Sequence, residues 1–249
     1  MRAPTPAQLL QVWESGCERP STARVLLLLA AANDDADADA LAALPVGRRD
    51  WLLIELHARL FRERIVGLAR CPQCGEELEA ALDCEDMLAS ASTERVPANA
   101  PMVHVLEHQG TTVHFRLPDS RDLLASHECG DAEHARSLLL ERCVISVDRA
   151  GEDLPSSSLT ETHTHALSAA MSNADPFADL RLSFRCPSCE AAWEAAFDPA
   201  RFVWEELQAW ALRTLSEIDL IARTYHWREA DILALGPQRR RAYLEMCAT

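Results

Sequence analysis

Four of the nine cysteines in this 249-residue chain lie in two motifs of the form Cys-Pro-x-Cys, the pattern in the sequence best suited to hold a metal ion. The motifs pair Cys71 with Cys74 and Cys186 with Cys189. Each lies in a longer repeat, because the stretches RCPQCGEELEAALD and RCPSCEAAWEAAFD are identical at eight of fourteen positions. This similarity indicates an internal repeat, so we expect the two cysteine pairs to be equivalent parts of one structure.

A cysteine pair of this spacing at the tip of a β-hairpin is a zinc knuckle, in which a tight turn holds both thiolates on one side. One knuckle supplies two ligands, whereas a closed structural zinc site requires four. We therefore expect Cys71, Cys74, Cys186 and Cys189 to bind one structural Zn²⁺ in a split zinc ribbon. The chain between the motifs would form an inserted subdomain, since closing a longer loop costs little additional entropy.

Two other interpretations of the cysteine pairs stay open. The motif also occurs in thioredoxin-like redox sites, although there it opens a helix, whereas here a second strand is expected after each pair. A ribbon can also lose its metal and keep its shape. The residue after the second cysteine often takes a left-handed conformation, which suits Gly75, whereas Glu190 in the second motif gives no such indication.

The flanking sequence predicts the strands that position the pairs. IVGLAR precedes the first motif and EELEAALD follows it, while LRLSFR and AAWEAAFD flank the second, so each pair is expected at the tip of a hairpin. Between the repeats we expect further elements of a small α+β subdomain: a linker over 91–100, a hairpin around Gly110, helices from Ser120, over about 131–143 and up to Met171, and a loop over 151–158.

Helices are expected at both ends of the chain. The first 62 residues predict a helix near Trp13, a buried helix over 25–32, a polar tract over 33–40 and a helix over 51–61 with Asp50 as its N-cap. Pro199 predicts the start of a long helix, followed by short helices over about 228–234 and 237–246. The fold is therefore expected to be α+β and mostly helical. Its predicted parts are N-terminal helices over 1–62, the split ribbon over 63–90 and 178–198, the inserted subdomain over 91–177 and C-terminal helices over 199–249.

Composition excludes several classes of function. The net charge of −15 would repel phosphate backbones, so we expect no nucleic-acid partner. The longest apolar run, Val25 to Ala32, is too short to span a bilayer, and no secretory signal is visible, so a cytoplasmic protein is expected. Nucleophile-elbow, P-loop, HExxH and dinucleotide motifs are missing from the sequence, so we expect neither an enzyme nor a small-molecule substrate.

Three other clusters are given structural interpretations. His163 and His165 point apart on a helix and are interpreted as solvated surface residues. The stretch from His127 to His134 is interpreted as polar helix ends, and the QRRR run at 238–241 as a solvated or carboxylate-pairing face. The remaining cysteines have no motif around them and are interpreted as small core residues or exposed thiols.

The C-terminal sequence carries the most specific pattern. From Trp227 through Glu245 it reads W-x-E-x-D-I-L-A-L-x-P-x-R-R-x-x-Y-L-E. The stretch LLIELHARLFRERIVGLARCPQCGE from Leu52 and the paired ribbon belong to the same pattern. Together they resemble a family of proteins encoded beside phage tails and contractile injection systems. Members of this family relate to the T4-type baseplate hub assembly chaperone. The resemblance implies a non-enzymatic assembly factor or structural component of a contractile particle, with baseplate or tail proteins as partners.

The last two predicted helices form an amphipathic element that would either fold onto the core of the chain or bind a groove on a partner. The apolar residues expected to bind a partner are Trp227, Ile232, Leu233, Leu235, Tyr243 and Leu244. Two other function classes stay open: a zinc ribbon linked to nucleic acid or transcription, which would need a basic face beside the knuckles, and an enzyme of unrecognised type.

Overall fold

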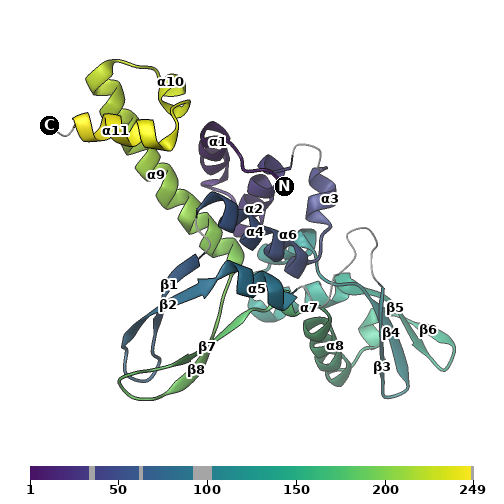
Figure 1. Cartoon of the computed structure of the whole chain (residues 1–249). Coiled ribbons are helices and arrows are strands. Elements are labelled where there is room, and N and C mark those ends of the chain that lie inside the picture. The colour runs from purple at the N-terminus through teal and green to yellow at the C-terminus, as the bar shows by residue number, and fades with distance from the viewer. Residues whose placement is uncertain (34–36, 62–63, 92–102, 248–249) are drawn as a thin grey trace.

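The computed structural model describes residues 1–33, 37–61, 64–91 and 103–247, and its fold is α+β, as predicted. Helices form a body and a long projecting arm, while the strands form three small antiparallel sheets (Figure 1). Two sheets are two-stranded hairpins, and the third has four strands in the order β3-β4-β5-β6. None of the helices in the described part of the chain combines the length and the apolar character needed to cross a bilayer.

The helical body is built around a leucine-rich core. Helix α9 crosses this body and packs against α1, α2 and α4, with Leu28, Leu29, Leu53 and Leu207 fully buried between them. Each such side chain contributes about 1.5–3 kcal/mol by leaving water. The body contains α1 (Pro6–Gly16), α2 (Ser21–Ala31), α3 (Ala38–Ala42), α4 (Val46–Leu60) and α9 (Pro199–Tyr225).

Local sequence signals set the ends of two of these helices. Thr5 and Gln8 form a reciprocal capping box at the start of α1. The Asp198 carboxylate accepts backbone hydrogen bonds from the first turn of α9, which begins at Pro199 as predicted. That helix ends at Tyr225, where the next residue, His226, takes a left-handed conformation with φ of 57°.

The predicted start of α4 is wrong. The helix begins at Val46, so Asp50 lies inside it and is only 4% exposed. Its Oδ1 accepts a hydrogen bond from Nε of Arg49 at 2.7 Å. Burial raises the pKa of Asp50 to about 6, and the neighbouring Arg49 opposes this shift only in part. Asp50 therefore belongs to a buried ion pair and not to a helix cap.

The cap of α4 comes from a distant part of the chain. Pro45 precedes the helix and makes no side-chain capping bond. The backbone N–H of Gly47 instead donates to Oδ2 of Asp175 at 2.9 Å, across 128 residues of sequence. Asp175 is followed by the short 3₁₀ helix η2 (Pro176–Ala178), which packs against α4. This contact fixes the end of the inserted region beside α4.

The inserted region is a four-stranded sheet with helices packed against it. The hairpin around Gly110 and the helices from Ser120, over about 131–143 and past Met171 are confirmed. The predicted 151–158 loop is wrong in part, because residues 152–154 form a strand. Its elements are β3 (His104–His108), β4 (Thr111–Phe115), α6 (Ser120–His127), α7 (Ala132–Cys143), β5 (Val144–Arg149), β6 (Glu152–Leu154), η1 (Ser156–Ser158) and α8 (Glu161–Ala174).

Strand β5 was not predicted from the sequence, and its geometry gives the reason. Ile145 and Ser146 are both exposed, so the alternation of buried and exposed residues breaks at the start of the strand. A register shift between His114 and Phe115 on the neighbouring strand accompanies this break. The predicted linker over 91–100 lies outside the described residues from residue 92 onwards.

The two predicted knuckle hairpins are confirmed as hairpins that extend side by side from the body (Figure 1). Helix α5 (Cys84–Ala91), which was not predicted, follows the first of them. The hairpin strands are β1 (Arg64–Arg70) with β2 (Glu77–Asp83), and β7 (Arg181–Arg185) with β8 (Ala192–Ala196). The division of the chain into four domains stays a prediction.

The C-terminal helices α10 (Glu229–Leu233) and α11 (Pro237–Cys247) fold back against the far end of α9 (Figure 1). Ile232 is fully buried there, beside the buried Ile221 of α9. The predicted break between the two helices at Gly236-Pro237 is confirmed. The end of α9 therefore carries a second apolar cluster, which borders the leucine core of the body through Trp13 and Trp210.

We predict that Asp175→Ala lowers the free energy of unfolding by about 1–2 kcal/mol, because α4 loses its N-terminal acceptor. Asp175→Asn keeps an oxygen acceptor and should change stability far less. Asp179→Ala is the control, since its side chain is exposed and pairs with the exposed Arg181. Chemical denaturation of the variants measures the effect. Equal losses for the alanine and asparagine variants at position 175 would contradict the capping role.

Candidate metal centre

The two cysteine turns have the same backbone hydrogen bonds. In the first, the N–H of Cys71 donates to the carbonyl of Glu76 at 2.8 Å, and the N–H of Gly75 donates to the carbonyl of Cys71 at 2.9 Å. In the second, the N–H of Cys186 donates to Ala191 at 2.9 Å, and that of Glu190 donates to Cys186 at 3.0 Å. The sequence repeat is therefore a repeat of structure.

The residue after the second cysteine has a left-handed backbone in both turns. Its φ is 78° at Gly75 and 59° at Glu190. Glycine adopts this conformation without strain, whereas glutamate pays a steric cost of roughly 1–2 kcal/mol. The departure from glycine in the second motif therefore leaves the turn geometry unchanged and places strain next to the cysteines.

The tips of the hairpins bring the four cysteine sulfurs together. All four Sγ atoms lie within 4.8 Å of one another, with Cys71 and Cys189 3.7 Å apart and Cys74 and Cys186 3.5 Å apart. A tetrahedral ion with metal–sulfur bonds of about 2.3 Å requires sulfurs about 3.8 Å apart. These cysteines form no disulfide. The arrangement can hold a metal ion with four thiolate ligands.

A shared hydrophobic base aligns the two hairpins. Ile65 at the start of β1 is buried in a cluster with Ile54 of α4 and Phe177 of η2. The base of the second hairpin closes through the N–H of Phe197, which donates to the carbonyl of Leu180 at 2.8 Å, and both side chains join the same cluster. Because both hairpins start from this cluster, their tips meet.

The acidity of the cysteines differs across the cluster. Backbone hydrogen bonding, led by the amide of Cys74, lowers the pKa of Cys71 to about 7. At Cys74 the amide of Glu76 lowers the pKa, but the sulfurs of Cys186 and Cys189, with desolvation, outweigh it and raise the pKa to about 12. Neighbouring anions thus oppose full ionisation of the cluster. A bound divalent cation removes that opposition, because it deprotonates the thiols that coordinate it.

Carboxylates outnumber arginines on the described strands and turns around the centre. Glu76, Glu79, Glu190 and Glu194 are exposed on the hairpins, and exposed arginines on the strands partly pair with carboxylates, as Arg70 does with Glu77. Exposed carboxylates repel the phosphate groups of a nucleic acid, so this surface does not favour nucleic-acid binding.

The C-terminal residues predicted to bind a partner lie at the end of the arm, folded onto the core of the chain. Ile232 is fully buried, whereas the other five are half-buried. The rings of Trp227 and Tyr243 meet edge to face with centroids 4.8 Å apart, and Tyr225 stacks on Trp227 at 5.2 Å. The sequence left two alternatives for these residues, and the structure shows the first, in which they pack on the chain itself. The binding of a partner by these residues stays a prediction.

The other clusters are structural in the described residues. The interpretation of His163 as solvated is wrong: it is 3% exposed, and its Nδ1 accepts the backbone N–H of Thr160 at 3.4 Å as part of a helix cap. Asp131 caps α7, as expected for polar helix ends. In the QRRR run, Arg240 pairs with Glu217 at 3.0 Å, which confirms the carboxylate-pairing face.

Fold and site together define an α+β protein with one four-cysteine centre able to hold a metal ion. The family model described as the T4 bacteriophage base plate protein matches residues 20–203 of the chain. The chain therefore belongs to this baseplate family. Neither the curated proteins nor the solved structures searched contain a significant match. The family match covers both cysteine motifs and ends at the start of α9, so the C-terminal pattern from Trp227 lies beyond it.

We predict opposite effects for two substitutions in the turns. Gly75→Ala should lower the free energy of unfolding by about 1 kcal/mol, because alanine resists the left-handed backbone. Glu190→Gly should raise it by up to about 1 kcal/mol, because it removes that strain. Thermal unfolding measures both. Gly130→Ala, at an open position with ordinary φ, is the control. A loss of stability in Glu190→Gly would show that the turn is not strained.

Proposed function

We propose that this protein is a non-enzymatic assembly factor or structural component of the baseplate of a contractile, phage-tail-like particle. The observation that carries the proposal is the baseplate family match over residues 20–203, which includes both hairpins, the inserted region and helices α2 to α4 of the body. The C-terminal pattern from Trp227 to Glu245 supports it independently, because it lies outside the matched region. The protein would act in the cytoplasm and either stay in the particle or leave after assembly.

We further propose that the four-cysteine centre binds structural Zn²⁺ and completes a split zinc ribbon. Four thiolate donors at tetrahedral spacing suit zinc and leave no position for substrate. Cys71 and Cys186 are buried, while Cys74 is exposed, so the ion would enter from the tip. When bound, the ion would join two hairpins that are far apart in sequence, and its binding free energy would add to that of folding.

The partner surface in this proposal is the end of the projecting arm. The half-buried rings of Tyr225, Trp227 and Tyr243 meet there, and Met246 beside them is 54% exposed. Trp and Tyr are among the residues that most often carry the binding energy of an interface. The buried Ile232 holds the helices in place, so the rings can be presented to a baseplate or tail protein without unfolding.

We expect protein purified without chelator to contain about one zinc per chain, as four-thiolate sites do. Cys189→Ser should lose the metal and unfold at lower temperature, because a ligand is removed. Cys129→Ser, outside the cluster, should keep both metal and stability. Elemental analysis and thermal denaturation provide the measurements. A wild-type protein with no zinc and nine titratable thiols would rule out the zinc assignment.

We also expect deletion of the gene to abolish assembly of tail-like particles in the native host. Wild-type protein should restore the particles, and Trp227→Ala should not, although it should keep its metal. Leu220→Ala, exposed on the same arm, is the control and should restore them. Mass spectrometry of the particles then separates the two roles, since a structural component is present at stoichiometric level and an assembly factor is not. Normal particles in the deletion strain would refute the proposed function.

A further inference from the structure

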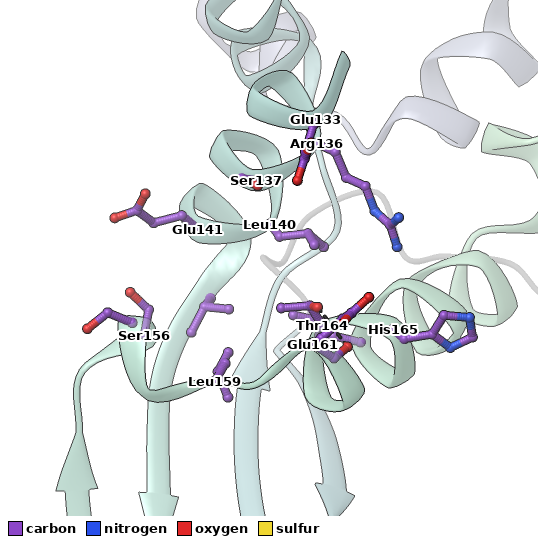
Figure 2. Close-up of a pocket in the computed structure, with 13 residues that line it drawn as sticks. Glu133, Arg136, Ser137, Leu140, Glu141, Ser156, Leu159, Glu161, Thr164 and His165 are labelled. Atoms are coloured by element: carbon purple, nitrogen blue, oxygen red, sulfur yellow. Dashed lines mark hydrogen bonds between the residues drawn. The ribbon is translucent and has the colours of Figure 1, made fainter. Parts of the chain in front are cut away.

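A groove between α7 and α8 lies far in sequence from the cysteines. It encloses about 400 Å³ and is closed at one end by η1 and Leu159. Figure 2 shows Leu140 and Leu159 pointing into the space between the two helices. Leu140 is 7% exposed, Leu167 is fully buried, and Val144 and Leu159 are half-buried, so the floor is aliphatic. A floor of this kind favours an apolar occupant.

The rim of the groove is acidic. Glu133 and Glu141 of α7 and Glu161 of α8 line it with exposed carboxylates. The lining contains one arginine, Arg136, whose guanidinium donates to the Ser168 hydroxyl at 3.2 Å. These charges are part of the net charge of −15 carried by the whole chain. The field at the groove therefore favours an occupant with positive charge beside its apolar part.

A small polar ligand does not fit these features. The groove is lined by four charged residues and one histidine, and all of these are exposed at the rim: Glu133, Arg136, Glu141, Glu161 and His165. Binding a small charged molecule inside the groove would need such groups at the floor. An apolar side chain entering from solvent, with its flanking charges outside, matches both the floor and the rim.

We propose that this groove binds a segment of another protein that presents one aliphatic side chain flanked by lysine or arginine. The complementarity of the acidic rim and the aliphatic floor carries the proposal. It goes beyond the proposed baseplate role and depends neither on the metal centre nor on the aromatic end of the arm.

The test uses purified full-length protein and a fluorescein-labelled peptide in which one leucine lies between lysines, with anisotropy as the readout. Two further peptides replace the leucine by serine or the lysines by glutamate. The leucine–lysine peptide should bind, and each replacement should weaken binding at least about tenfold, because one removes the anchor and the other the charge match. Binding should also weaken as the salt concentration rises.

A pair of charge reversals separates the groove from general attraction to an acidic protein. Glu141→Lys with Glu161→Lys should weaken the leucine–lysine peptide at least about tenfold. Glu14→Lys with Glu18→Lys makes the same change in net charge at exposed sites near α1 and should bind like the wild type. Unchanged melting temperatures confirm that both double variants are folded. Equal weakening in the two variants, equal binding of the serine peptide, or no binding to the wild type would overturn the proposal, and none of these results bears on particle assembly.

Discussion

The four-cysteine centre depends on the long-range contact between η2 and α4, in which the Gly47 N–H donates to Asp175 and Phe177 packs in the apolar cluster shared by both hairpins. Helix α4 leads into the first hairpin and η2 leads into the second, so fastening η2 to α4 gives both hairpins a common base. Phe177 of η2 adds apolar area to the same contact, because it is buried with Ile54 and Ile65. Two hairpins that leave one base side by side must meet at their tips, and the tips are where the cysteines lie.

This arrangement explains how an insertion can divide the centre without disrupting it. The cost of closing the chain between the two knuckles rises slowly with its length, so the insertion is tolerated if its ends are held together. Here they are held at the base, by Asp175 and by the apolar cluster around Phe177, and the four cysteine sulfurs at the tips lie within 4.8 Å of one another. A metal ion would then act on hairpins that are already aligned, and its contribution would be to restrict the tips further and to relieve the repulsion between thiolates.

Features encoded within a few residues could be predicted from the sequence, whereas features assembled across the chain could not. Both knuckle hairpins and the start of α9 follow from local motifs, and so their predictions are confirmed. The start of α4 was misjudged because its cap is Asp175, and the sequence around Asp50 gives no sign of it. His163 looked like a surface residue because its burial depends on packing of the subdomain. The acidic groove lies between α7 and α8, and no spacing in the sequence predicts that these two helices pack side by side.

The charges of the chain divide it into two regions of different binding character. In residues 199–249 seven arginines balance seven carboxylates, so the net charge of −15 belongs to the residues before them. The residues before 199, which include the acidic groove between α7 and α8, carry this charge, and its field favours basic partners. Residues 199–249 carry no net charge and contain the aromatic cluster, so the partner contact proposed there would rest on apolar area and would be less sensitive to salt. The two proposed surfaces would therefore take chemically different partners, which is what joining components of a larger particle requires.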